Sequence, residues 1–200
     1  MIKTLKIDLL SEWRSGTGRG RGLYLDAEAR KDQLGLPMIP GKQLKGLVRH
    51  ALETGAAWGH WDSNLVERLC GASSEAAEDS RFDTDQGCLS ISSARMSHEW
   101  QRYFSDLRER DLELSLKSSA RLFVTRRQTA MNSHGLVQEK TLRTVEVCVP
   151  MTLYARIQGD LTSDELKVLE RALSLIRAVG AHTTRGLGRA KLSLTDEGQA

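Results

Sequence analysis

A loop rich in glycine and arginine leads into a basic segment in the first quarter of the chain. From Gly16 to Gly22 the sequence reads Gly-Thr-Gly-Arg-Gly-Arg-Gly, and Gly35-Leu-Pro-Met-Ile-Pro-Gly41 follows as a proline-set turn. The glycines predict a flexible loop whose backbone can approach a ligand closely. A loop of this kind before a helix N-terminus is suited to holding a phosphate backbone, which indicates nucleic acid as the ligand.

The residues after Gly41 have the spacing of an amphipathic helix. The apolar positions recur at i, i+3, i+4, i+7 and i+8, and they are Leu44, Leu47, Val48, Ala51 and Leu52. The cations fall off this stripe, at Lys42, Lys45 and Arg49. Such charges are usually only a solvated helix face, but the loop before them and the partial positive charge of the helix N-terminus favour an anionic ligand.

Charge is distributed unevenly along the 200 residues. Residues 1–50 hold ten Lys or Arg against five Asp or Glu, residues 51–120 seven against thirteen, and residues 121–200 twelve against eight. The net charge of +3 carries little information by itself. A fold that brings the two basic ends together would form one positive surface, with the acidic middle facing elsewhere or toward a basic neighbour.

The composition argues against several classes of protein. Cys70, Cys88 and Cys148 are far apart and odd in number, which disfavours a disulfide framework and favours the reducing cytoplasm. No two of the five histidines lie at a spacing of i, i+3 or i+4, and no CxxC pair occurs, so a zinc site is not expected. The sequence also has no signal peptide pattern and no apolar run long enough to span a membrane.

The order of predicted elements favours an α+β fold. We expect strands over 2–10, 87–96, 121–127, 142–157 and 190–194, a helix beginning near 41, and further helices over 64–70, 98–110 and 162–179. Gly55 and Gly59 are expected to break the chain after the first helix, and Ser63 is expected to cap the second. Thr162 with Glu165 is expected to form a capping box on a last helix that Gly180 closes.

This order predicts a ferredoxin-like or RRM-like antiparallel sheet with helices on one face and long inserted loops. The whole chain, 1–200, is expected to be one domain with insertions near 11–40, 72–86 and 128–141. First and last strands commonly lie close together in such a sheet. That proximity would bring the loop at 19–21, the helix start at 42–45 and the glycine-rich turn at 185–189 within reach of one ligand.

Three motifs in the same order resemble the RAMP superfamily of CRISPR-associated proteins. They are the segment 35–49, the segment Gly87-Cys-Leu-Ser-Ile-Ser-Ser-Ala94, and Thr184-Arg-Gly-Leu-Gly-Arg189. The resemblance is closest to the small backbone subunits of type III effector complexes. It implies a cytoplasmic protein that assembles in several copies along CRISPR guide RNA, contacts other effector subunits, and cuts the paired target RNA.

The resemblance also implies roles for individual residues. Asp26 corresponds to the catalytic aspartate, with Asp32 as the second candidate, and Asp26 would hold a divalent metal such as Mg²⁺ or orient a ribose 2′-OH. The span from Arg126 to Glu146 corresponds to a thumb-like hairpin that inserts into the guide–target duplex. The expected RNA-binding residues contact phosphates without reading sequence: Arg19, Arg21, Lys42, Lys45, Arg49, Arg126, Arg127, Arg185 and Arg189.

Two alternatives remain open at this point. One is a metal-independent RAMP endoribonuclease that processes precursor CRISPR RNA and uses His50 or His182 as an acid–base residue. The other is a non-catalytic scaffold subunit that only binds RNA. The first motif and the short chain favour the backbone branch over the processing branch.

Overall fold

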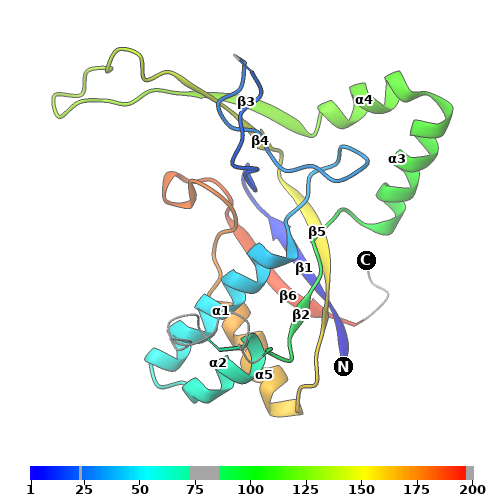
Figure 1. Ribbon diagram of the computed structural model, residues 1–200, viewed down its shortest axis with the longest axis vertical. Helices are drawn as coiled ribbons and strands as arrows, with labels where there is room; N and C mark the ends of the chain where they lie inside the picture. The colour runs from blue at the N-terminus through cyan, green and yellow to red at the C-terminus, as the bar shows by residue number, and fades with distance from the viewer. Residues whose placement is uncertain (23, 73–85, 197–200) are drawn as a thin grey trace.

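The computed structural model describes residues 1–22, 24–72 and 86–196, and a four-stranded antiparallel sheet lies at its centre (Figure 1). The strands are β1 (Ile2–Leu9), β2 (Ser90–Ile91), β5 (Met151–Gln158) and β6 (Ala190–Thr195), in the order β2-β5-β1-β6. Each strand runs antiparallel to its neighbours, and β1 pairs with both β5 and β6. The first and last strands therefore lie side by side, and the ferredoxin-like prediction is confirmed.

Three helices gather on one side of this sheet: α1 (Gly41–Ala57), α2 (Ser63–Cys70) and α5 (Ser163–Leu173) (Figure 1). The apolar stripe of α1 is largely buried, with Leu44 and Leu52 fully inaccessible to solvent. These side chains join the buried residues of the strands and of α5 in one core that includes Leu5, Ile7, Leu153, Ile157 and Leu169. Among the described residues, no helix is long and apolar enough to cross a membrane.

A second, two-stranded sheet stands apart from the first. It pairs β3 (Phe123–Gln128) with β4 (Arg143–Cys148), and the connection over 129–142 projects away from the body of the molecule (Figure 1). Before it, α3 (His98–Arg110) and α4 (Leu112–Ala120) pack against each other. A short 3₁₀ helix, η1 (Thr183–Arg185), lies in the turn before β6.

Several boundaries differ from the sequence prediction. The expected strand 87–96 is paired as a regular strand only over Ser90–Ile91. The segment 142–157 divides into β4 and β5, which belong to different sheets. The last helix ends at Leu173 rather than at Gly180, and α4 was not predicted. The predicted insertion near 72–86 falls mostly on 73–85, which are outside the described residues.

Two local predictions were wrong for identifiable reasons. Gly55 lies inside α1, where a Cβ would come within 1.9 Å of the Trp61 ring, so this glycine makes room for an indole rather than ending the helix. The cap of α2 is Asp62, not Ser63, because the Asp62 carboxylate accepts a hydrogen bond from the Asn64 N–H at 2.8 Å. An aspartate one residue earlier meets the same need for an acceptor.

The capping box of α5 is present as predicted. The Thr162 hydroxyl accepts from the Glu165 N–H at 3.3 Å, and Glu165 accepts from the Thr162 N–H at 2.7 Å. Thr162→Ala should lower the free energy of unfolding by about 1 kcal/mol, because it removes the N-cap acceptor. Thermal unfolding should then show a Tm lower by about 2–4 °C. Ser163→Ala, at the exposed neighbouring position, is the control, and an equal Tm for the two variants would contradict the prediction.

Candidate nucleic-acid interface

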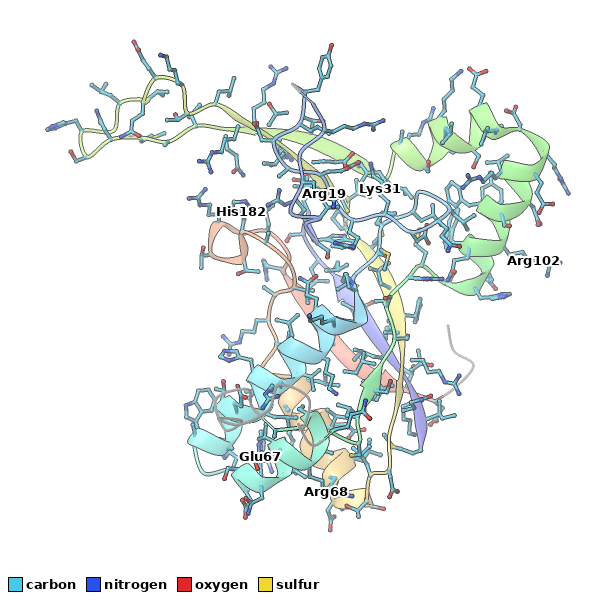
Figure 2. The ribbon with its side chains drawn as sticks, viewed as in Figure 1. Arg19, Lys31, Glu67, Arg68, Arg102 and His182 are labelled. Carbon is cyan, nitrogen blue, oxygen red and sulfur yellow. The ribbon has the colours of Figure 1, made fainter. Side chains whose placement is uncertain are left out.

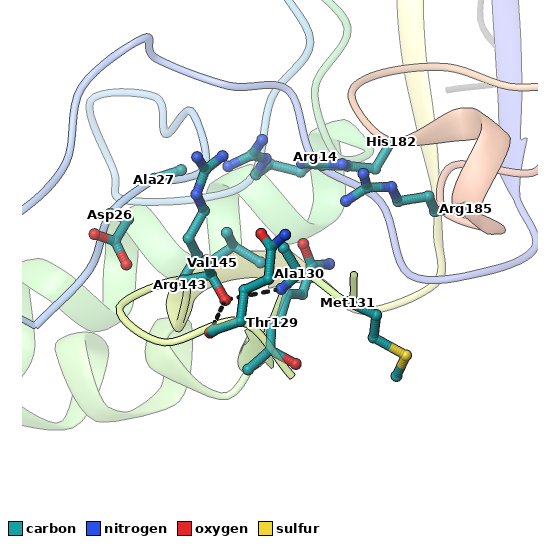
Figure 3. Close-up of a pocket in the computed structure, with 13 residues that line it drawn as sticks. Arg14, Asp26, Ala27, Thr129, Ala130, Met131, Arg143, Val145, His182 and Arg185 are labelled. Carbon is teal, nitrogen blue, oxygen red and sulfur yellow. Dashed lines mark hydrogen bonds between the residues drawn. The ribbon is translucent and has the colours of Figure 1, made fainter. Parts of the chain in front are cut away.

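Three segments that are far apart in the sequence meet around one hollow of about 750 Å³, which we call the basic groove (Figure 3). The segments are the loop after β1, the β3–β4 hairpin and the turn before β6. Polar side chains from all three line the groove: Arg14, Asp26, Gln128, Arg143, His182 and Arg185. The basic first and last parts of the chain thus meet on one surface, as the charge distribution predicted.

Residues 12–14 form the link between these segments. Trp13 exchanges backbone hydrogen bonds with Cys148 at the end of β4, at 3.1 and 2.7 Å. On the other side, the Ala181 N–H donates to the Arg14 carbonyl at 2.8 Å. Gly180 has a φ of +102°, and a Cβ there would lie 2.3 Å from the Arg14 oxygen, so only glycine fits this close approach. The backbone of Arg14 is therefore fixed from both sides.

The glycine-rich loop is folded back on itself. The Arg30 N–H donates to the Ser15 carbonyl at 2.7 Å, and the Arg21 N–H donates to the Leu25 carbonyl at 2.7 Å. A Cβ at Gly20 would lie 2.6 Å from the Leu25 oxygen, so this glycine permits close packing of the two arms. In the described part of the loop, backbone hydrogen bonds therefore pair the two arms in a hairpin-like arrangement.

Asp26 lies at one end of the basic groove and is exposed. Its N–H donates to the Thr144 carbonyl at 2.8 Å, and its Oδ2 accepts from the Thr144 N–H at 2.6 Å. This two-way contact ties the loop to β4 and directs the carboxylate. Its other oxygen, Oδ1, has no hydrogen-bond partner in the described parts of the chain and is available to a ligand.

Asp32 is placed differently. Its Oδ1 accepts from the N–H groups of Leu34 and Leu36, at 2.9 and 3.0 Å, and closes the turn that precedes the proline-set segment. It does not line the basic groove. An aspartate in this arrangement shapes a turn, so the geometry favours Asp26 over Asp32 as the residue available for chemistry.

Basic side chains line the rest of the groove. Arg14 is only 8 % exposed, and its burial lowers the pKa of its guanidinium. His182 adopts a left-handed conformation with a φ of +60°. The pKa of its imidazole is lowered by burial first and then by the charges of Arg14, Arg185 and Arg143. The imidazole is therefore held in its neutral form at pH 7.

The helix start at Lys42 and Lys45 borders a different hollow, beside β2. Gly41 is buried there, its N–H donates to the Ser93 hydroxyl at 3.2 Å, and a Cβ would lie 2.2 Å from the Ile91 oxygen. This glycine is needed for close packing of α1 on β2, not for the approach of a ligand to its N–H. Lys42 and Lys45 thus line a different hollow from Arg185, with which they were expected to lie within reach of one ligand.

The other predicted RNA-binding arginines lie outside the basic groove. Arg126 donates from Nε to a Glu12 oxygen at 2.8 Å and makes a second contact with the same carboxylate, and this hydrogen bonding lowers the pKa of Glu12. Arg49 is paired with Glu53 at 2.8 Å. The remaining side chains are exposed: Arg19 (Figure 2), Arg21, Arg127 and Arg189. His50 is also exposed, on α1, away from Asp26.

Sequence reasoning did not identify Arg14 and Arg143 as binding residues. Neither lies in a motif, and no spacing connects them, because the pairing of Trp13 with Cys148 acts over 135 positions of the chain. Among the described residues, no group of three or more His, Cys, Asp or Glu side chains could hold a metal. Asp26 is the one carboxylate among the groove-lining residues, so a divalent ion held there would need substrate phosphates among its other ligands.

The chain is similar to known proteins both in sequence pattern and in fold. The model of the RAMP superfamily matches residues 6–191. A chain of the cryo-EM structure of type III-B Cmr-beta in the apo state has a TM-score of 0.68 and 11 % identity, with 98 % of each chain covered. A chain of type III-B Cmr-beta bound to cognate target RNA has a TM-score of 0.67 and 11 % identity, with 97 % of each covered. No curated protein matches the sequence significantly.

Proposed function

The chain belongs to the RAMP superfamily, and we propose that it is a guide-RNA-binding backbone subunit of a type III-like CRISPR effector complex. The observation that carries this proposal is the basic groove, in which Arg14, Arg143 and Arg185 converge from three remote segments. Its partners are CRISPR guide RNA, target RNA, other effector subunits and further copies of itself in the cytoplasm. The fold likeness to Cmr-beta chains, one of them in a complex with target RNA, supports this choice within the superfamily.

The groove is suited to RNA of any sequence. Guanidinium groups recognise phosphate oxygens through planar pairs of hydrogen bonds and do not distinguish bases. Exposed cations outside the groove, such as Arg19, Lys42 and Arg189, extend the positive surface for further phosphates. A subunit that covers successive parts of an arbitrary guide needs this kind of contact, since base pairing carries the sequence information.

Cleavage of the paired target RNA is the accessory activity that Asp26 supports. The carboxylate is exposed at the groove and directed by Thr144, so it can hold a divalent ion or orient a ribose 2′-OH beside a phosphodiester. A bound Mg²⁺ would polarise a phosphate oxygen and offset negative charge. Arg143 in the same groove would stabilise charge that develops on the phosphate during cleavage.

A second candidate function rests on His182. This residue lines the same groove, and its lowered pKa keeps the imidazole neutral at pH 7, the form that accepts a proton. A metal-independent endoribonuclease that processes precursor CRISPR RNA would use such a base. We rank it second because the carboxylate of Asp26 is the more exposed and the more clearly directed group.

The stoichiometry of RNA binding tests the backbone proposal. Full-length protein is mixed with single-stranded RNAs of increasing length and unrelated sequence, and the mass of each complex is measured by light scattering. The acidic middle and the basic ends of the chain favour head-to-tail contacts between copies, an interface that does not close on itself. We therefore expect the number of protein copies to rise in proportion to RNA length. One protein copy on one short hairpin, whatever the RNA length, would favour the processing enzyme instead.

A further inference from the structure

We propose that the basic groove contains a phosphate-binding subsite centred on Arg14 and completed by Arg143, Arg185 and His182. The expected occupant is one phosphodiester group of a bound RNA strand. In that respect the inference rests on the proposed function. The subsite itself follows from the state of these side chains and can be tested without RNA.

Arg14 is the strongest evidence for a missing partner. It is 8 % exposed, and its Nε and Nη1 atoms are buried without any hydrogen-bond partner among the described residues. Buried polar groups almost always have partners, and a buried charge without one is strongly unfavourable. The Arg14 carbonyl accepts from the Ala181 N–H, and the preceding residue, Trp13, is paired with Cys148. The Arg14 side chain lies along the groove between His182 and Arg143 (Figure 3).

The neighbouring cations are also unpaired. Within the described residues, neither Arg143 nor Arg185 makes a side-chain hydrogen bond or ion pair, and both line the groove with Arg14. Elsewhere several arginines are matched to carboxylates, as Arg126 is to Glu12 and Arg68 is to Glu165. The groove thus concentrates positive charge that the protein does not neutralise.

The side chains that line the basic groove determine which ligand can bind there. Asp26 is the only carboxylate among the groove-lining residues, and its Oδ2 is already hydrogen-bonded to the Thr144 N–H. The pKa of the His182 imidazole is lowered first by burial and then by the charges of these same arginines, so their positive charge reaches the imidazole. Several guanidinium groups that line one groove favour a tetrahedral oxyanion, which accepts planar pairs of hydrogen bonds. A phosphate group meets this requirement.

Inorganic phosphate is the probe for the subsite. Thermal unfolding is measured at constant ionic strength with and without phosphate for the wild type, Arg14→Met and Arg102→Met. Arg102 is an exposed cation on α3, far from the groove (Figure 2), and serves as the matched control. We expect saturating phosphate to raise the Tm of the wild type and of Arg102→Met by about 5 °C, through preferential binding to the folded state. Arg14→Met should show no such rise.

Without phosphate, Arg14→Met should be no less stable than the wild type. We expect it to unfold at the same temperature as the wild type or higher, because the substitution removes an unpartnered buried charge. Arg14→Lys keeps a charge but loses the guanidinium fork, and it should show a reduced phosphate response. An equal rise in Tm for all the proteins would overturn the subsite, because it would reflect only the general stabilising effect of phosphate.

RNA affinity identifies the occupant and separates this inference from the proposed function. Arg14→Met should weaken binding of single-stranded RNA about tenfold relative to Arg102→Met. Loss of the phosphate response with unchanged RNA affinity would overturn the assignment of the subsite to RNA while leaving the proposed function intact. A normal phosphate response in a wild-type protein that binds no RNA would support the subsite and contradict the proposed function.

Discussion

Asp26→Ala is expected to reduce cleavage of paired target RNA by the assembled protein about 100-fold or more, with guide-RNA affinity unchanged or slightly higher. The carboxylate contributes where charge and protons move during cleavage, whereas in the bound ground state it repels the phosphate. Cleavage is measured with labelled target RNA under single-turnover conditions. Asp26→Asn refines the test, because an amide oxygen can still accept from the Thr144 N–H. An equal loss in this variant assigns the effect to the charge rather than to the hydrogen bond that holds the loop.

Three further variants test whether a residue other than Asp26 is needed for cleavage. Asp32→Asn keeps an acceptor for the N–H groups of Leu34 and Leu36, so it should leave cleavage intact. Loss of cleavage in Asp32→Asn, with Asp26→Ala active, would move the site by six residues. Loss only in His182→Ala or His50→Ala, together with activity that persists in chelator, would contradict the role of Asp26 and support metal-independent processing.

Combined charge reversal at Arg143→Glu and Arg185→Glu should have the largest effect on RNA binding. We expect affinity for unrelated single-stranded RNAs to fall at least about 100-fold and by similar factors, because both side chains bind phosphates rather than bases. The slope of log affinity against log salt should become shallower by about 0.7 for each phosphate that the variant no longer neutralises. Fluorescence anisotropy titrations over a range of salt concentrations measure both quantities.

Control variants separate the groove from the general charge of the surface. Arg102→Glu with Arg110→Glu changes net charge equally on α3, away from the groove, and should weaken binding only a few-fold. Lys42→Glu with Lys45→Glu tests the second hollow, and this pair should weaken the binding of RNAs of all sequences alike. A change in preference between sequences with an unchanged salt slope would contradict phosphate binding at the reversed positions.

Local sequence patterns predicted most of the fold correctly. The apolar spacing of α1, the capping box of α5 and the boundaries of α3 depend on residues close together in the chain. The antiparallel pairing of β1 with β6 followed from the order of elements. Predictions were wrong where tertiary contacts override local signals, as at Gly55, whose place inside α1 depends on the Trp61 ring.

The β4 segment illustrates the same limit. Its alternation of valines with Glu146 and Cys148 predicts one buried and one exposed face, yet Val145, Glu146, Val147 and Cys148 are all buried. Glu146 accepts from the Ala29 N–H at 3.1 Å and pairs with Lys31 at 3.0 Å, so a loop from the other end of the chain covers the second face. No local sequence pattern in β4 indicates that this loop covers its second face.

Only part of the site could be predicted from the sequence, because long-range pairing brings some of its residues together. Asp26 was identified through the family resemblance and Arg185 lies in the motif 184–189, and both line the basic groove. Arg14 and Arg143 lie in no motif, and they reach the groove only because residues 12–14 are held between β4 and the turn before β6. The sequence also offers no sign that Arg126 is engaged by Glu12. Long-range pairing, not residue type, decides which cations face a common ligand.

The central claim is that the basic groove holds the RNA backbone, and cross-linking tests it most directly. Full-length protein bound to a photoreactive single-stranded RNA is irradiated and digested, and the attached peptides are identified by mass spectrometry. We expect cross-links in the loop at 14–30, the hairpin at 126–145 and the turn at 180–189, the three segments that meet at the groove. Cross-links confined to α3 and α4, with none in those segments, would contradict the claim.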